Sequence, residues 1–89
     1  MTKTEIINEY LLELESINDS NGISNMLKKL NVTFGKEKTS NIDLKAESVE
    51  YLKKIAKGSP TKYTKEDLMS DKNTLKAFLQ RELINANGN

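Results

Sequence analysis

The residues of this chain that could do acid–base chemistry are its 13 aspartates and glutamates, because the 89-residue sequence contains no histidine and no cysteine. An acid–base pair needs one carboxyl group whose pKa is raised by burial. Glu82 is the one candidate for burial, since it falls inside the apolar arc of the last predicted helix, beside Phe78 and Leu79. Lone buried carboxylates are rare. We therefore favour a Glu82 that faces water at the helix end, or that a lysine reaches, over a desolvated functional group.

Other kinds of chemical site find no support in the sequence. A serine nucleophile has no histidine base and no G-x-S-x-G elbow, and neither glycine-rich phosphate-binding motif occurs. The run Asp71–Lys72–Asn73 begins like a calcium loop, but it lacks the central glycine and the bidentate glutamate. Without cysteine or histidine, disulfides and zinc fingers are excluded. We expect a protein that is not an enzyme and that uses no cofactor and no metal.

The net charge of +1 hides an uneven distribution of charge along the chain. Residues 1–20 contain five acidic residues and one lysine, whereas residues 21–65 contain ten lysines and four acidic residues. A basic middle segment can contact nucleic-acid phosphates with a salt-dependent affinity. The alternative is a solvated surface on which lysines alternate with glutamates. The candidate nucleic-acid-binding residues are Lys28, Lys29, Lys53, Lys54, Lys57, Lys62 and Lys65, with Tyr63 as a side chain that can stack on a base.

A second candidate surface lies on the first predicted helix. Leu12 projects away from the apolar arc of that helix and adjoins an acidic stripe formed by Glu5, Glu9 and Glu13. An exposed leucine beside carboxylates suits a basic, partly apolar groove on another protein. A single surface leucine is also ordinary and can pack under a loop. The partners expected for this surface are another protein or a second copy in a dimer.

Hydrophobic periodicity predicts a mostly α fold, a compact single domain of four to five short helices. Residues 1–84 are expected to form the domain and residues 85–89 a frayed tail. Residues 31–43 leave two alternatives, a minor two-stranded hairpin near residues 32–39 or a loop from which Phe34 enters the core. The predicted helices span about residues 4–17, 21–30, 44–57, 64–70 and 73–84.

The first two helices are predicted to form an antiparallel hairpin that packs on the third and the last helix. Leu52 falls in the apolar arc of the third helix, so Leu52→Ala is predicted to cost roughly 2–5 kcal/mol. The predicted core residues are Ile7, Leu11, Leu14, Ile23, Leu27, Leu30, Leu52, Ile55, Leu75, Phe78 and Leu79.

The expected location is cytoplasmic without a membrane partner, because the sequence shows no apolar run of membrane-span length and no signal-peptide core. Lysine far outnumbers arginine, and asparagine and isoleucine are abundant, which indicates an AT-rich coding genome. Small lysine-rich proteins without cofactors are common among the phage and mobile-element products of bacteria that have AT-rich genomes. We expect a non-catalytic regulatory or inhibitory binding protein that acts through protein–protein contacts. The alternative is a nucleic-acid-binding regulator that uses residues 28–65.

Overall fold

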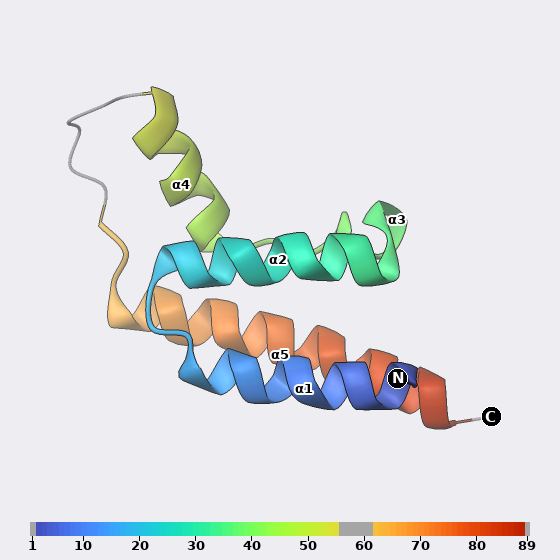
Figure 1. The fold of residues 1–89 in the computed structure, drawn as a ribbon. Coiled ribbons are helices and arrows are strands. Elements are labelled where there is room, and N and C mark those ends of the chain that lie inside the picture. The colour runs from blue at the N-terminus through green and yellow to red at the C-terminus, as the bar shows by residue number, and fades with distance from the viewer. Residues whose placement is uncertain (1, 56–61, 89) are drawn as a thin grey trace.

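The computed structural model describes residues 2–55 and 62–88, and the regular secondary structure of these residues is entirely helical, which confirms the predicted mostly α fold (Figure 1). The molecule measures 49 × 24 × 20 Å along its principal axes. None of the helices in the described ranges combines the length and the apolar character that a bilayer crossing requires. The helices are α1 (Lys3–Ser16), α2 (Ser20–Phe34), α3 (Lys36–Thr39), α4 (Lys45–Ile55) and α5 (Lys65–Asn87).

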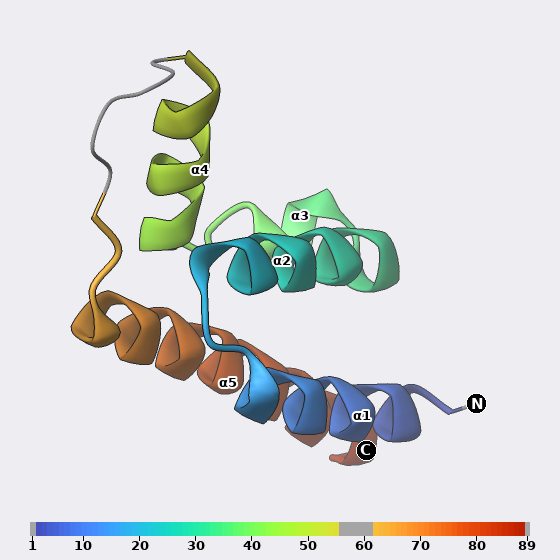
Figure 2. The same ribbon diagram turned by 60° about the vertical axis from the view of Figure 1, so that its left-hand side comes forward.

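Helices α1 and α5 lie side by side and run in opposite directions (Figures 1 and 2). Polar contacts hold the pair together at both ends. The Thr4 hydroxyl donates to Asn87 Oδ1 at 2.9 Å. Lys72 Nζ donates to the backbone carbonyls of Glu15 and Ile17, each at 3.0 Å. The lysine thus places a cation at the carboxyl end of α1, where unsatisfied carbonyls and the helix dipole favour positive charge.

Helix α2 lies over the α1–α5 pair and closes the core (Figure 1). Its apolar side chains recur every three or four residues, which puts them on one face. Phe34, at the end of α2, meets Phe78 of α5 edge to face, with ring centroids 5.4 Å apart. Helix α1 contacts α5 more extensively than it contacts α2, so the predicted α1–α2 hairpin is only a minor part of the packing. The buried apolar residues are Ile7, Leu14, Ile23, Met26, Leu27, Leu30, Leu44, Ala46, Leu75, Phe78 and Leu79.

The segment for which a hairpin or a loop was predicted is largely helical. Helix α2 continues to Phe34, and Gly35 turns the chain directly into α3. Gly35 has a φ angle of +91°, which side-chain-bearing residues rarely adopt. Of the two alternatives, the hairpin at residues 32–39 does not form, and most of the segment is helix instead of loop. The helical spacing of Leu27, Leu30 and Phe34 outweighs the short alternation around Val32. Phe34 does pack against the core.

One long helix, α5, replaces the two helices predicted at residues 64–70 and 73–84. A capping box begins this helix, since the Thr64 hydroxyl accepts from the Asp67 amide and the Asp67 carboxylate accepts from the Thr64 amide. The gap between the two predicted helices falls at Asp71 and Lys72, whose side chains bond to other helices. Asp71 bonds to α4 and Lys72 bonds to the end of α1, so neither side chain competes for the local backbone. Residues 85–87, which were expected to fray, belong to the helix.

Helix α4 leaves the body of the molecule at an angle (Figures 1 and 2). Ala46 in its first turn is fully buried, whereas Leu52 and Ile55 in its last turns are 44% and 60% exposed. The prediction that these two residues belong to the core is wrong, because no neighbouring helix covers the side of α4 that carries them within the described parts of the chain. The predicted end of this helix, at residues 56 and 57, lies outside the described residues.

Candidate functional site

The acidic stripe predicted for protein binding is on α1, and its members have different surroundings. Glu5 completes a capping box with Thr2, whose hydroxyl accepts from the Glu5 amide at 3.2 Å. Glu13 forms an ion pair with Lys29 of α2, at 2.8 Å. Glu9 is exposed, and Leu12 is 68% exposed. All four residues are exposed, and among the described parts of the chain only Glu5 and Glu13 use their side chains in a cap or an ion pair.

The predicted nucleic-acid surface includes lysines that pair with carboxylates. The Lys29 ammonium is held by Glu13, which raises the pKa of Lys29 above its ordinary value. Lys53 pairs with Glu50 at 3.2 Å, and the Ser20 hydroxyl together with Lys53 lowers the pKa of Glu50. Lys57 lies outside the described residues. The other lysines of this set, Lys28, Lys54, Lys62 and Lys65, are exposed.

Tyr63, the predicted base-stacking residue, is half-buried and takes part in a network that sequence reasoning missed. Its hydroxyl donates to Asp71 Oδ2 at 2.6 Å. Asp71 is only 1% exposed, and its two carboxylate oxygens also accept from the backbone amides of Lys45 and Ala46, each at 2.9 Å. These amides are at the N-terminus of α4, where the first N–H groups of a helix lack partners within the helix. Asp71 of α5 therefore caps α4 across the tertiary structure.

The Tyr63–Asp71 bond predicts how stability changes with pH. Burial and the neighbouring Asp71 carboxylate raise the pKa of Tyr63 above its ordinary value of 10.0. Above about pH 10 the unfolded chain loses this proton while the folded chain keeps it, so the free energy of unfolding falls as the pH rises. Tyr63→Phe removes both the hydrogen bond and the ionisation. We expect it to cost roughly 1–2 kcal/mol at pH 7 and less at higher pH.

Urea unfolding measures this effect when it is done on the wild-type protein and on Tyr63→Phe at pH 7, 9, 10 and 11. These conditions bracket the ordinary tyrosine pKa. Tyr51→Phe is the matched control, since it makes the same chemical change at a tyrosine that is 62% exposed on α4. A difference between the wild-type protein and Tyr63→Phe that stays constant from pH 7 to 11 would contradict the prediction.

Glu82 is buried, and Lys38 of α3 reaches it, with 3.0 Å between Lys38 Nζ and Glu82 Oε1. The structure thus bears out one of the readings favoured from the sequence, in which a lysine neutralises this carboxylate. A buried carboxylate left without its cation would be strongly destabilising. The pair fastens the short α3 to α5, and this contact explains why a glutamate is tolerated on the apolar side of the helix.

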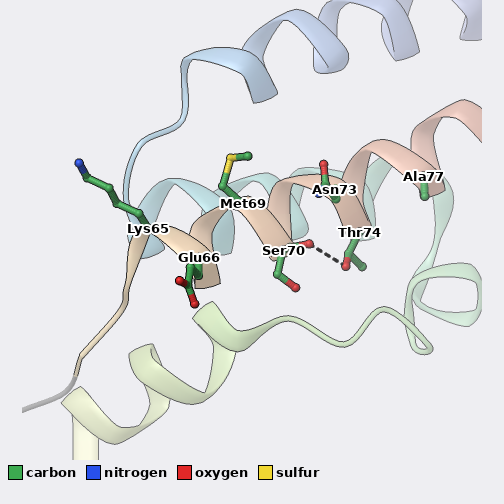
Figure 3. Close-up of a pocket in the computed structure, with 7 residues that line it drawn as sticks. All are labelled: Lys65, Glu66, Met69, Ser70, Asn73, Thr74 and Ala77. Atoms are coloured by element: carbon green, nitrogen blue, oxygen red, sulfur yellow. Dashed lines mark hydrogen bonds between the residues drawn. The ribbon is translucent and has the colours of Figure 1, made fainter.

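An open groove of about 780 Å³ runs along one side of α5 (Figure 3). All of its lining residues belong to this one helix, and Figure 3 shows Met69 and Asn73 pointing to one side of it and Glu66 and Ser70 to the other. The Thr74 hydroxyl is already used, because it donates to the Ser70 carbonyl at 3.0 Å. The polar groups therefore do not converge on a common point. The lining residues are Lys65, Glu66, Met69, Ser70, Asn73, Thr74 and Ala77.

The outward face of α4 is the surface that stands out among the described residues. We use this name for the exposed side chains of Ser48, Tyr51, Leu52 and Ile55. At about 100° per residue they share one side of the helix, opposite the buried Ala46. Tyr51 is 62% exposed, so three large apolar side chains on this face are open to solvent. Contiguous exposed apolar side chains of this kind mark interaction sites in soluble proteins.

Sequence reasoning found this apolar arc but assigned it to the core. Periodicity shows that a helix has an apolar face, and it does not show whether the same chain or a partner covers that face. No signal in the sequence identified Asp71 as a cap for α4, because the two residues it binds lie 25 and 26 positions away.

No cluster of three or more acidic side chains that could hold a metal ion occurs within residues 2–55 and 62–88. Comparisons of this chain with known protein families, with curated proteins and with solved structures find no match.

Proposed function

We propose that this chain is a non-catalytic regulatory or inhibitory binding protein that acts through protein–protein contacts and uses the outward face of α4. The observation that carries the proposal is the exposure of Tyr51, Leu52 and Ile55 on one side of a helix that projects from the body. A cytoplasmic protein of a bacterial phage or mobile element is the setting that its size and lysine-rich composition favour.

The energetics of exposed apolar side chains support this assignment. Burying a large aliphatic or aromatic side chain is worth about 1.5–3 kcal/mol, and the fold forgoes much of that gain at three neighbouring positions. Tyrosine is enriched among the residues that dominate binding energies, and the exposed Lys54, at the edge of this face, contributes to the polar rim found around such contacts. A surface of this kind gains free energy when another protein covers it.

The alternative, a nucleic-acid-binding regulator, is less favoured. Lys29 and Lys53 have carboxylate partners, and Tyr63 has its hydroxyl on Asp71. A mobility-shift titration across salt concentrations separates the two functions, because binding through phosphate contacts weakens steeply as salt is added. A strongly salt-dependent shift would favour the alternative.

Affinity capture with paired variants tests the proposal. The immobilised wild-type protein is exposed to a lysate of the source cell or its host, beside Leu52→Glu/Ile55→Glu. The matched control is Val32→Glu/Ile84→Glu, since Val32 and Ile84 are 87% and 68% exposed on other helices. We expect the wild-type protein and the control to retain the same partner, and the α4 variant to retain at least about tenfold less. Equal retention by all three proteins would show that another surface binds.

A further inference from the structure

We propose that the outward face of α4 docks on the same face of a second copy of this chain, with the two α4 helices antiparallel. This inference rests on the proposed function, because it assigns an occupant to the same face. A contact related by a two-fold axis uses one patch on both molecules, so the patch must be complementary to itself. The outward face of α4 meets this requirement in the spacing of its apolar side chains, and the charged residues along its edge meet it as well.

The apolar side chains have the spacing of a helix–helix seam. Ser48, Tyr51 and Ile55 follow one another at intervals of three and four residues, which is the alternation of the core positions in paired helices. Leu52 lies beside this seam, on one of its two edges. In an antiparallel pair this edge faces the same edge of the second copy. The small Ser48 lies opposite the larger apolar side chains of the other copy, so bulky residues fill the space that serine leaves.

The charges along the other edge of the seam select the antiparallel arrangement. Glu47 and Lys54 are seven residues apart and therefore occupy the same edge, two turns from each other. Equivalent edge positions face each other in an antiparallel pair, so Glu47 of one copy meets Lys54 of the other, and the reverse pair forms as well. In a parallel pair Glu47 would face Leu52. Both side chains are exposed, and neither takes part in an ion pair within the described parts of the chain.

The position of α4 leaves room for a second helix, because α4 projects away from the α1–α5 pair (Figures 1 and 2). Its 11 residues give a contact smaller than the roughly 1,200 Å² of a standard stable interface. The homodimer is therefore weak and depends on concentration. At high protein concentration it covers the apolar face, and it yields that face to a partner that binds more tightly.

Sedimentation velocity between about 1 and 500 μM, a range suited to a weak contact, tests the inference. The wild-type protein is expected to shift from 10.1 kDa to twice that mass as its concentration rises. Leu52→Glu should weaken association at least tenfold, whereas the control Val32→Glu should associate like the wild-type protein. A wild-type protein that stays monomeric throughout, or a Leu52→Glu variant that dimerises equally well, would overturn the inference.

Charge reversal tests the antiparallel register. Glu47→Lys and Lys54→Glu should each weaken association, because each places like charges opposite one another. An equimolar mixture of the two variants should recover association, as should Glu47→Lys/Lys54→Glu in one chain. Failure of both recoveries would overturn the antiparallel pairing. These outcomes are independent of the lysate capture: a chain that never dimerises can still retain a partner through α4, and a dimer can form where no partner is captured.

Discussion

Asp71→Ala is expected to lower the free energy of unfolding by roughly 3–5 kcal/mol, a large share of the total for a domain of this size. The Asp71 carboxylate is buried, and it accepts from the amides of Lys45 and Ala46 and from the Tyr63 hydroxyl. Removing it leaves the buried Ala46 amide without its acceptor and takes an acceptor from two part-buried donors, the Lys45 amide and the Tyr63 hydroxyl. An unsatisfied buried group costs about 1–3 kcal/mol. The shorter side chain also opens a small space between α4 and α5.

Urea unfolding of Asp71→Ala, Asp71→Asn and Asp43→Ala measures this effect. Asp71→Asn preserves the shape of the side chain but has one accepting oxygen, so its loss should be intermediate. Asp43→Ala is the matched control, because Asp43 is exposed just before α4 and its loss should cost less than about 1 kcal/mol. An Asp71→Ala protein as stable as the control would show that Asp71 does not hold α4 in place.

Amide hydrogen exchange adds a local readout to the same experiment. Because Asp71 caps the first turn of α4, its loss should lower protection in α4 more than in α1, which is held to α5 by other contacts. Equal loss of protection in the two helices would point to general destabilisation instead of a local cap.

The helical elements could be predicted from the sequence where local signals and packing agree. In α1, the Thr2–Glu5 capping box and the spacing of Ile7 and Leu14 act on the same helix, and the structure contains both features. In α5, Thr64 and Asp67 mark the helix start correctly. Such signals depend on residues within one or two turns of each other, so a single sequence contains them in full.

The remaining features could not be predicted because they depend on contacts between distant residues. The run Asp71–Lys72–Asn73 has turn-forming composition, yet Asp71 and Lys72 find their partners on α4 and α1, and α5 continues through them. The apolar arc of α4 is a similar case. Its spacing is that of a core helix, and only the three-dimensional arrangement shows Leu52 and Ile55 facing solvent.

Leu79→Ala and Leu52→Ala make the same chemical change on α5 and α4 and are expected to differ sharply in stability. Leu79 is fully buried among the side chains of the core, so removing its branched end should leave a cavity and cost roughly 2–5 kcal/mol. Leu52 is 44% exposed, and alanine there leaves no enclosed cavity, so we expect a change within about 0.5 kcal/mol.

Thermal or urea unfolding of both variants at low protein concentration measures the difference without a contribution from self-association. At high concentration Leu52→Ala should also lose the extra stability that dimer formation gives to the wild-type protein, while Leu79→Ala should lose stability at every concentration. A Leu52→Ala protein as destabilised as Leu79→Ala when dilute would mean that Leu52 is covered within its own chain. The outward face of α4 would then be part of the core, as its spacing alone predicts, and would not be free to bind.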